Sequence, residues 1–147
     1  MRLTRDGIAA LVPHAGAMCL LDGVTDWDEQ HIRCVSRSHL DPNNPLRAQG
    51  GLPAVCGIEY AAQAMAVHGG LAGGTQGKPR MGFLASLRDV DCLRDRLDDL
   101  GGELVVEAER LMGDEARVIY QFTVSVGEIA VLTGRAAVVL QGEEERK

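Results

Sequence analysis

The fold of this chain is decided by the stretch Gly51-Leu52-Pro53-Ala54-Val55-Cys56-Gly57-Ile58-Glu59-Tyr60-Ala61-Ala62-Gln63-Ala64-Met65-Ala66-Val67-His68-Gly69-Gly70. Pro53 suits the first turn of a helix, and Gly69-Gly70 is typical of a helix end. The apolar residues between them lie on nearly all sides of such a helix, and a helix that is apolar all round is buried. The sequence therefore predicts one long buried helix over about residues 53–69.

Glu59 is the only carboxylate in this predicted helix. An isolated buried charge is costly, and desolvation favours the protonated form of a carboxyl group, so Glu59 must be paired, neutralised or used. Gln63 lies one helical turn further on and could hydrogen-bond to it. Two interpretations follow: Glu59 points to solvent through a gap in the packing, or it is a general acid or base.

Composition limits the class of protein. The chain has 147 residues and a net charge of −6, and its 15 basic residues are scattered, which argues against a nucleic-acid partner. The four cysteines form no CxxC pair and no cluster with metal-ligand spacing, so no metal is expected. No apolar run has the length of a membrane span, and no signal peptide is recognisable. We expect a single cytoplasmic domain over residues 1–147 with a frayed tail at 142–147.

The remaining chain predicts strands. A first hairpin is expected over residues 18–37, with its turn at 28–30. After the helix, loose alternation of apolar residues predicts a strand at 80–90, and clearer alternation predicts three more that begin near Leu104, Val118 and Ile129. This order indicates an α+β fold, in which an antiparallel sheet buries the helix only by curling around it.

Two motifs carry a resemblance to a known family. Pro53, Val55, Glu59, Ala62, Gln63 and Ala64 match in step a Pro-Gly-Val-Leu-x-x-Glu-Ala-x-Ala-Gln-like run, and residues 12–22, Val-Pro-His-Ala-Gly-Ala-Met-Cys-Leu-Leu-Asp, are similar to a Leu-Pro-His-x-x-x-x-Leu-Leu-Val-Asp segment. Both motifs belong to the hotdog-fold 3-hydroxyacyl-acyl-carrier-protein dehydratases. The chain most resembles a divergent branch of predicted dehydratases that accompany aryl-polyene-type biosynthesis. The resemblance implies a hotdog fold, a curved antiparallel sheet wrapped around one long central helix.

The chain departs from this family at the catalytic histidine. The family carries a Gly-His-Phe-Pro loop shortly before the central helix, whereas residues 45–52 here are Pro-Leu-Arg-Ala-Gln-Gly-Gly-Leu and contain no histidine. The usual histidine therefore cannot be assigned from the motif. His14 is the only histidine of this chain inside a family-like motif and is the internal candidate for the base.

The implied activity is that of a hydro-lyase, which removes water from a 3-hydroxyacyl thioester in fatty-acid or polyene biosynthesis. Such a reaction needs a base for the C2 proton, an acid for the departing hydroxyl and hydrogen-bond donors for the thioester carbonyl. Glu59 is the expected acid, His14 the candidate base, and Ala54, Val55 and Gln63 the expected substrate-binding residues. The Ala54 N–H, at the helix start, could polarise the carbonyl.

The resemblance also implies partners. The substrate is expected on the phosphopantetheine arm of an acyl carrier protein, with no other cofactor, and the chain is expected to dimerise with a copy of itself or with another hotdog subunit. Two further functions stay open on the sequence: a hotdog acyl thioesterase, in which Glu59 directs water at the thioester, and a catalytically incomplete acyl-binding subunit.

Overall fold

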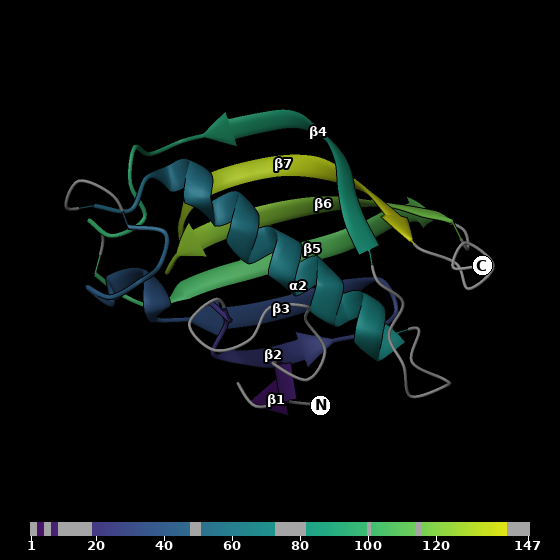
Figure 1. Ribbon diagram of the computed structural model, residues 1–147, viewed down its shortest axis with the longest axis horizontal. Coiled ribbons are helices and arrows are strands. Elements are labelled where there is room, and N and C mark those ends of the chain that lie inside the picture. The colour runs from purple at the N-terminus through teal and green to yellow at the C-terminus, as the bar shows by residue number, and fades with distance from the viewer. Residues whose placement is uncertain are drawn as a thin grey trace.

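The computed structural model describes residues 3–4, 7–8, 19–47, 51–72, 82–99, 101–113 and 116–140. Its strands form one antiparallel sheet of seven strands in the order β1-β2-β3-β5-β6-β7-β4 (Figure 1). The strands are β1 (Leu3–Thr4), β2 (Gly23–Trp27), β3 (His31–Ser36), β4 (Gly82–Cys92), β5 (Leu104–Gly113), β6 (Arg117–Val126) and β7 (Ile129–Leu140). One long α-helix, α2 (Gly57–Ala72), crosses one face of this sheet.

Helix α2 begins at Gly57, later than the predicted start at about residue 53, and it also ends later than predicted. Pro53 is the N-cap of a 3-10 turn, η3 (Ala54–Cys56), and α2 follows directly from it. The prediction that Gly69-Gly70 ends the helix is wrong, because α2 continues to Ala72. Gly70 is buried and Leu71 packs against the core. Tertiary packing thus outweighs the low helix propensity of the two glycines.

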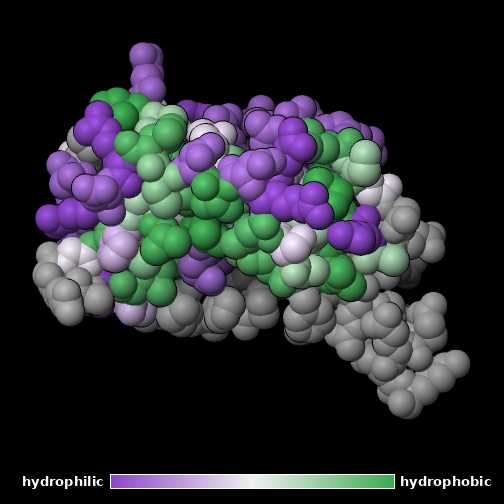
Figure 2. All heavy atoms as spheres, turned by 90° about the horizontal axis from the view of Figure 1, so that it is seen from above, coloured by the Kyte–Doolittle hydropathy of each residue, from purple (hydrophilic) through white to green (hydrophobic). Residues whose placement is uncertain are grey.

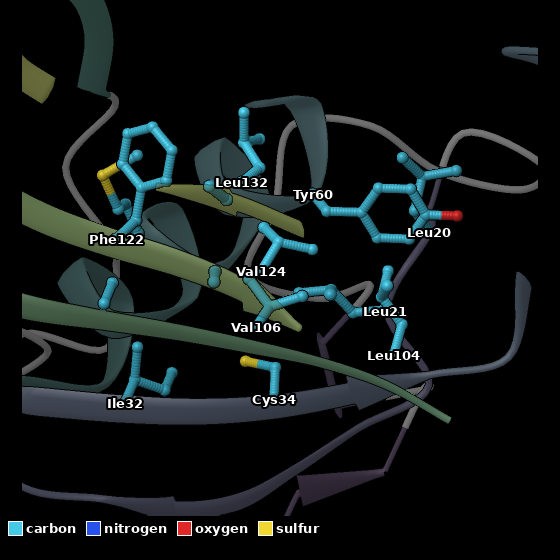
Figure 3. Packing of buried hydrophobic residues seen from close by; sticks show 14 of the residues in the cluster. Leu20, Leu21, Ile32, Cys34, Tyr60, Leu104, Val106, Phe122, Val124 and Leu132 are labelled. Carbon is cyan, nitrogen blue, oxygen red and sulfur yellow. The ribbon is translucent and has the colours of Figure 1, made fainter. Parts of the chain in front are cut away.

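The core lies between α2 and the sheet (Figure 3). Tyr60 and neighbouring helix residues face strands whose buried positions alternate, as in β6, where the buried residues are Val118, Tyr120, Phe122, Val124 and Val126. Because successive side chains of a strand point to opposite faces, this pattern leaves the other sheet face in contact with solvent. The predicted α+β arrangement, an antiparallel sheet around one buried helix, is therefore confirmed.

One glycine of β7 makes room for the aromatic ring of Phe122 in the sheet core. Gly134 lies opposite Phe122 in the pairing of β6 and β7. A Cβ atom at Gly134 would lie 2.7 Å from Phe122 Cζ and 3.1 Å from Val90 Cγ2. Any larger residue at this position would therefore displace the Phe122 ring.

The first hairpin and the C-terminal strands agree with the sequence prediction. Strands β2 and β3 pair around the turn at 28–30, and the strand predicted at 80–90 is β4, shifted by two residues. The predicted N-terminal loop with His14 and the tail at 142–147 lie outside the described residues. In the part of the chain that the structure describes, no helix is both long and apolar enough to span a bilayer.

Candidate active site

The start of the central helix is fixed by a short pairing with the segment that follows β4. The Leu97 N–H donates to the Leu52 carbonyl at 2.9 Å, and the Ala54 N–H donates to the Asp95 carbonyl at 2.9 Å. The sequence predicted that the Ala54 N–H polarises a thioester carbonyl. In the structure this N–H donates to Asp95 instead. Val55 is the next residue of the turn, and helix geometry gives the N–H groups of a first turn no intrahelical acceptor.

Val55, Glu59 and Gln63 follow one another at four-residue spacing, so they lie along one side of the helix. Their exposure falls along this line. The Val55 side chain is 54% exposed, Glu59 is partly buried, and Gln63 is 2% exposed. The Glu59 carboxyl group therefore lies at the boundary between the surface and the interior of the protein.

Gln63 is hydrogen-bonded to the Glu59 carboxylate from the next turn of the helix. Its amide Nε2 donates to Glu59 Oε2 at 3.3 Å, as the four-residue spacing predicted. Its amide oxygen Oε1 accepts the backbone N–H of Leu20 at 2.9 Å. Because the second bond fixes the orientation of the amide group, the NH₂ rather than the oxygen faces Glu59. Gln63 therefore orients the Glu59 carboxylate, and its role in binding substrate stays a prediction.

A buried polar network holds Leu20 from its other side. The Leu20 carbonyl accepts the hydroxyls of Ser36 at 2.6 Å and Ser38 at 2.7 Å. The Tyr60 hydroxyl lies 2.7 Å from Ser38 Oγ and accepts Asn44 Nδ2 at 3.0 Å. Since the Ser38 proton goes to the carbonyl, Tyr60 donates to Ser38. Both backbone polar groups of Leu20 are thus bonded by side chains.

The three described histidines are engaged away from this line. His68 is buried: its Nε2 lies 2.8 Å from the Asp28 carbonyl and its Nδ1 2.7 Å from the Tyr120 hydroxyl. A carbonyl only accepts, so Nε2 carries the proton and Tyr120 donates to Nδ1. Burial lowers the pKa of His68 and raises the pKa of Tyr120 to about 12. His31, on β3, lies 3.3 Å from a Glu107 oxygen.

His39 is buried before the central helix. Its Nε2 donates to the Gly102 carbonyl at 2.9 Å, and its Nδ1 has no hydrogen-bond partner among the described residues. Burial lowers the pKa of His39 and therefore favours the neutral ring. His39 and His68 are therefore both buried and hydrogen-bonded within the protein. His14, the candidate base, lies outside the described residues.

Asp98 organises the loop in front of the helix, and the sequence did not single it out. Its side chain is 3% exposed and accepts two bonds from Arg96, at 3.0 and 2.8 Å, and one from Arg47 at 3.2 Å. It also accepts the Leu52 N–H at 3.1 Å. The hydrogen bonds from Arg96 hold the pKa of Asp98 well below its usual range. The cluster fixes the backbone one residue before Pro53.

The free edge of the sheet next to the helix start is apolar. Among the described strands, β4 pairs with β7 alone, and it is exposed over most of its described length. Leu84, Leu87 and Leu93, in or just after β4, are exposed, as is Val55. Figure 2, which views the molecule from above and so from the β4 side, shows hydrophobic side chains gathered across the middle of this face. An exposed edge strand of this kind is a template for pairing with another chain.

Cysteine and metal chemistry have little support here. Cys56 lies beside the helix start, and burial raises the pKa of its thiol, which disfavours the reactive thiolate. Across the described ranges, no three His, Cys, Asp or Glu side chains come together in a group that could hold a metal ion.

Similar structures share this architecture. A structure described as the dehydratase heterocomplex ApeI:P from Xenorhabdus doucetiae matches with a TM-score of 0.83 and 25% identity over 95% of this chain and 93% of that chain. A thioesterase from Haemophilus influenzae matches with a TM-score of 0.65 and 14% identity, over 95% and 91% of the two chains. The E. coli PaaI protein matches with a TM-score of 0.62 and 15% identity, over 92% and 88%. The last two show the hotdog fold alone.

The sequence itself places the chain among dehydratases. No curated protein sequence matches it. The family described as ApeP-like, ApeP dehydratase, matches residues 7–146, which is nearly the whole chain. This agrees with the dehydratase resemblance found in the helix motif around Glu59. The chain belongs to the ApeP-like dehydratase family.

Proposed function

We propose that this protein is a dehydratase subunit that removes water from a 3-hydroxyacyl thioester carried on the phosphopantetheine arm of an acyl carrier protein. The observation that carries the proposal is the line from exposed Val55 to Glu59, whose carboxylate is bonded by buried Gln63. Elimination needs a proton donor for the departing hydroxyl, and Glu59 is a partly buried carboxyl group one helical turn from exposed Val55. The acyl chain enters along Val55.

The thioester carbonyl needs donors where negative charge develops during removal of the C2 proton. The Ala54 N–H is bonded to Asp95, so in this proposal the Val55 N–H in the same turn takes that role. The positive end of the helix dipole adds to its effect. Asp98 supports this geometry, because it binds the Leu52 N–H and so fixes the strand that leads into the turn.

The base is the second element of the proposal. The described histidines are bonded elsewhere, which leaves His14 or a residue of a partner chain. The β4 edge with its exposed leucines supports pairing with a second hotdog subunit. The relative from Xenorhabdus doucetiae, described as a heterocomplex, supports a partner that differs from this chain. In such a pair, sheets joined edge to edge would bring the partner's residues close to the start of α2.

The test is dehydration of a 3-hydroxyacyl carrier protein, followed by mass spectrometry of the acyl chain. The purified chain is assayed alone and mixed with a second hotdog subunit, each time as wild type and as Glu59→Gln. Glu128→Gln, in the exposed turn between β6 and β7, is the matched control with the same chemical change. We expect loss of water with wild type and control, and a fall of at least about 100-fold in Glu59→Gln, the size typical of a lost general acid.

The same assay separates the other functions and the two sources of the base. Loss of the whole acyl group in place of water would indicate a thioesterase. Activity that appears only on mixing assigns the base to the partner, whereas activity of the chain alone that is abolished by His14→Ala assigns it to His14. Full activity of Glu59→Gln would refute the proposal.

A further inference from the structure

The outer face of the sheet, opposite α2, carries a hollow of about 210 Å³ with three arginines at its rim. Its floor is Ala137 in β7, which lies between Ser86 of β4 and Ile119 of β6 in the strand pairing. Ile119 and Ala137 each follow or precede a residue of the core cluster, Tyr120 and Ala136, and successive strand residues point to opposite faces, so both face away from the core. A small floor residue between larger neighbours leaves the concavity open.

The arginines stand at the two ends of this floor. Arg88 and Arg135 lie directly opposite each other on β4 and β7, two residues from Ser86 and Ala137. Arg117 lies two residues from Ile119 on β6, on the other side of the floor, because the strands are antiparallel. All three are exposed. Three guanidinium groups are thereby directed around one hollow.

The direct pairing of Arg88 with Arg135 does not stabilise the fold. Like charges directly opposite on neighbouring strands are destabilising. In the described part of the chain neither Arg88 nor Arg135 forms an ion pair. The chain as a whole carries a net charge of −6, so the concentration of positive charge at this place is not a general property of its surface. An anionic ligand would remove the repulsion between Arg88 and Arg135.

The kind of anion follows from the geometry. A guanidinium group binds two oxygens of a phosphate or carboxylate in a forked pair of hydrogen bonds. One arginine suffices for a carboxylate, whereas three around one hollow match the several oxygens and the double charge of a phosphate. The hollow is smaller than the roughly 300–1,000 Å³ of sites that enclose a whole small molecule. It therefore takes one group and leaves the rest of the ligand outside.

We propose that the Arg88–Arg117–Arg135 hollow binds the phosphate group of a phosphate ester. The Ser86 hydroxyl supplies a further donor at the floor. The site is separate from the Glu59 line, since it lies on the opposite face of the sheet. Edge-to-edge pairing of β4 leaves it accessible, because the hydrogen bonds of such pairing lie in the plane of the sheet and the arginines extend from its face.

The proposal is tested by ¹H–¹⁵N NMR titration of the full-length chain with inorganic phosphate, with acetate at the same ionic strength as the reference anion. We expect phosphate, and not acetate, to shift the amides of Ser86, Ile119 and Ala137. Arg135→Gln and Arg88→Gln each weaken binding by about tenfold or more, as expected for the loss of a charge-assisted hydrogen bond. Arg94→Gln, an exposed arginine outside the hollow, carries the same charge change and leaves the Kd unaltered.

Two esters then identify the source of the phosphate. Phosphopantetheine represents a prosthetic arm and adenosine 3′,5′-bisphosphate represents a nucleotide. If one ester binds with a Kd at least tenfold below that of inorganic phosphate, the proposal is supported and that ester indicates the source. If both esters bind with the same Kd as inorganic phosphate, the hollow recognises the phosphate group alone. Equal shifts with acetate, an Arg94→Gln effect as large as that of Arg135→Gln, or wild-type binding in the Arg88→Gln/Arg135→Gln double variant would overturn it.

Discussion

Replacing Gln63 separates its two hydrogen bonds and tests the organisation of the site. Gln63→Met keeps the length of the side chain but removes the acceptor of the Leu20 N–H and the donor to Glu59. A buried N–H left without a partner costs about 1–3 kcal/mol, and this is the expected loss in the free energy of unfolding. The Glu59 carboxylate also loses its fixed orientation, so dehydratase activity falls by more than the loss of folded protein explains.

Gln63→Glu keeps one of these two interactions and makes the other repulsive. It keeps an acceptor for Leu20 but places a second carboxylate about 3.3 Å from Glu59. Two unit charges at this distance repel by about 5 kcal/mol at an effective dielectric constant of 20, so the folded state keeps one of the two groups protonated. In the unfolded chain both groups lose their protons above pH about 4. The folded state then binds more protons than the unfolded state, and stability falls as the pH rises from 4 to 8.

The measurement is urea denaturation of both variants at pH 5 and pH 8, with dehydratase activity assayed in parallel. Gln121→Met, on an exposed position of β6, is the control for the loss of a surface amide. The reasoning is refuted if Gln63→Met unfolds within about 0.5 kcal/mol of wild type, the range of ordinary surface substitutions. It is equally refuted if the stability of Gln63→Glu relative to wild type is the same at both pH values.

Three further changes have defined outcomes. Because burial lowers the pKa of His68, the unfolded state takes up a proton first as the pH falls below about 6.5, so the melting temperature should drop between pH 7 and pH 5; His68→Gln should flatten this slope, and an unchanged slope would contradict the argument. Gly134→Ala should lower the free energy of unfolding by about 1–3 kcal/mol, because its Cβ would lie 2.7 Å from Phe122 Cζ; thermal melts that coincide with wild type would show that the ring moves freely. Arg88→Gln should raise the melting temperature slightly at low salt by relieving the repulsion from Arg135, and the gain should shrink in 1 M NaCl; a loss of stability at low salt would count against that repulsion.

The contacts of the site between residues close together in the sequence could be predicted. Glu59 and Gln63 are one turn apart, and the periodicity of a helix is enough to predict their hydrogen bond. The second partner of Gln63 was not predictable, because Leu20 lies 43 residues away and contributes only a backbone group, which has no signature in its side chain. The Arg96-x-Asp98 spacing offered a hint of a pair. It did not reveal that Asp98 is buried or that it binds Leu52.

Other differences between the prediction and the structure also come from contacts between distant segments. Gly69-Gly70 is a good stop signal by propensity, but packing of the helix end against the core continues α2 to Ala72. His68 and His39 are polar residues whose burial depends on acceptors from distant segments, the carbonyls of Asp28 and Gly102. Strands β5 to β7, by contrast, could be predicted from their alternating apolar and polar residues. Each of them pairs with its neighbour along the chain, so no distant segment is needed to form them.

The way in which Leu20 is bonded has a consequence for the order of folding. Its amide depends on Gln63, 43 residues later, and its carbonyl on Ser36 and Ser38, 16 and 18 residues later. The partners of the carbonyl come within reach when β2 and β3 pair, whereas the partner of the amide is in place only when α2 has packed on this hairpin. Closing the longer loop costs more entropy. The backbone bonds of Leu20 are therefore complete only after α2 has packed against the first hairpin.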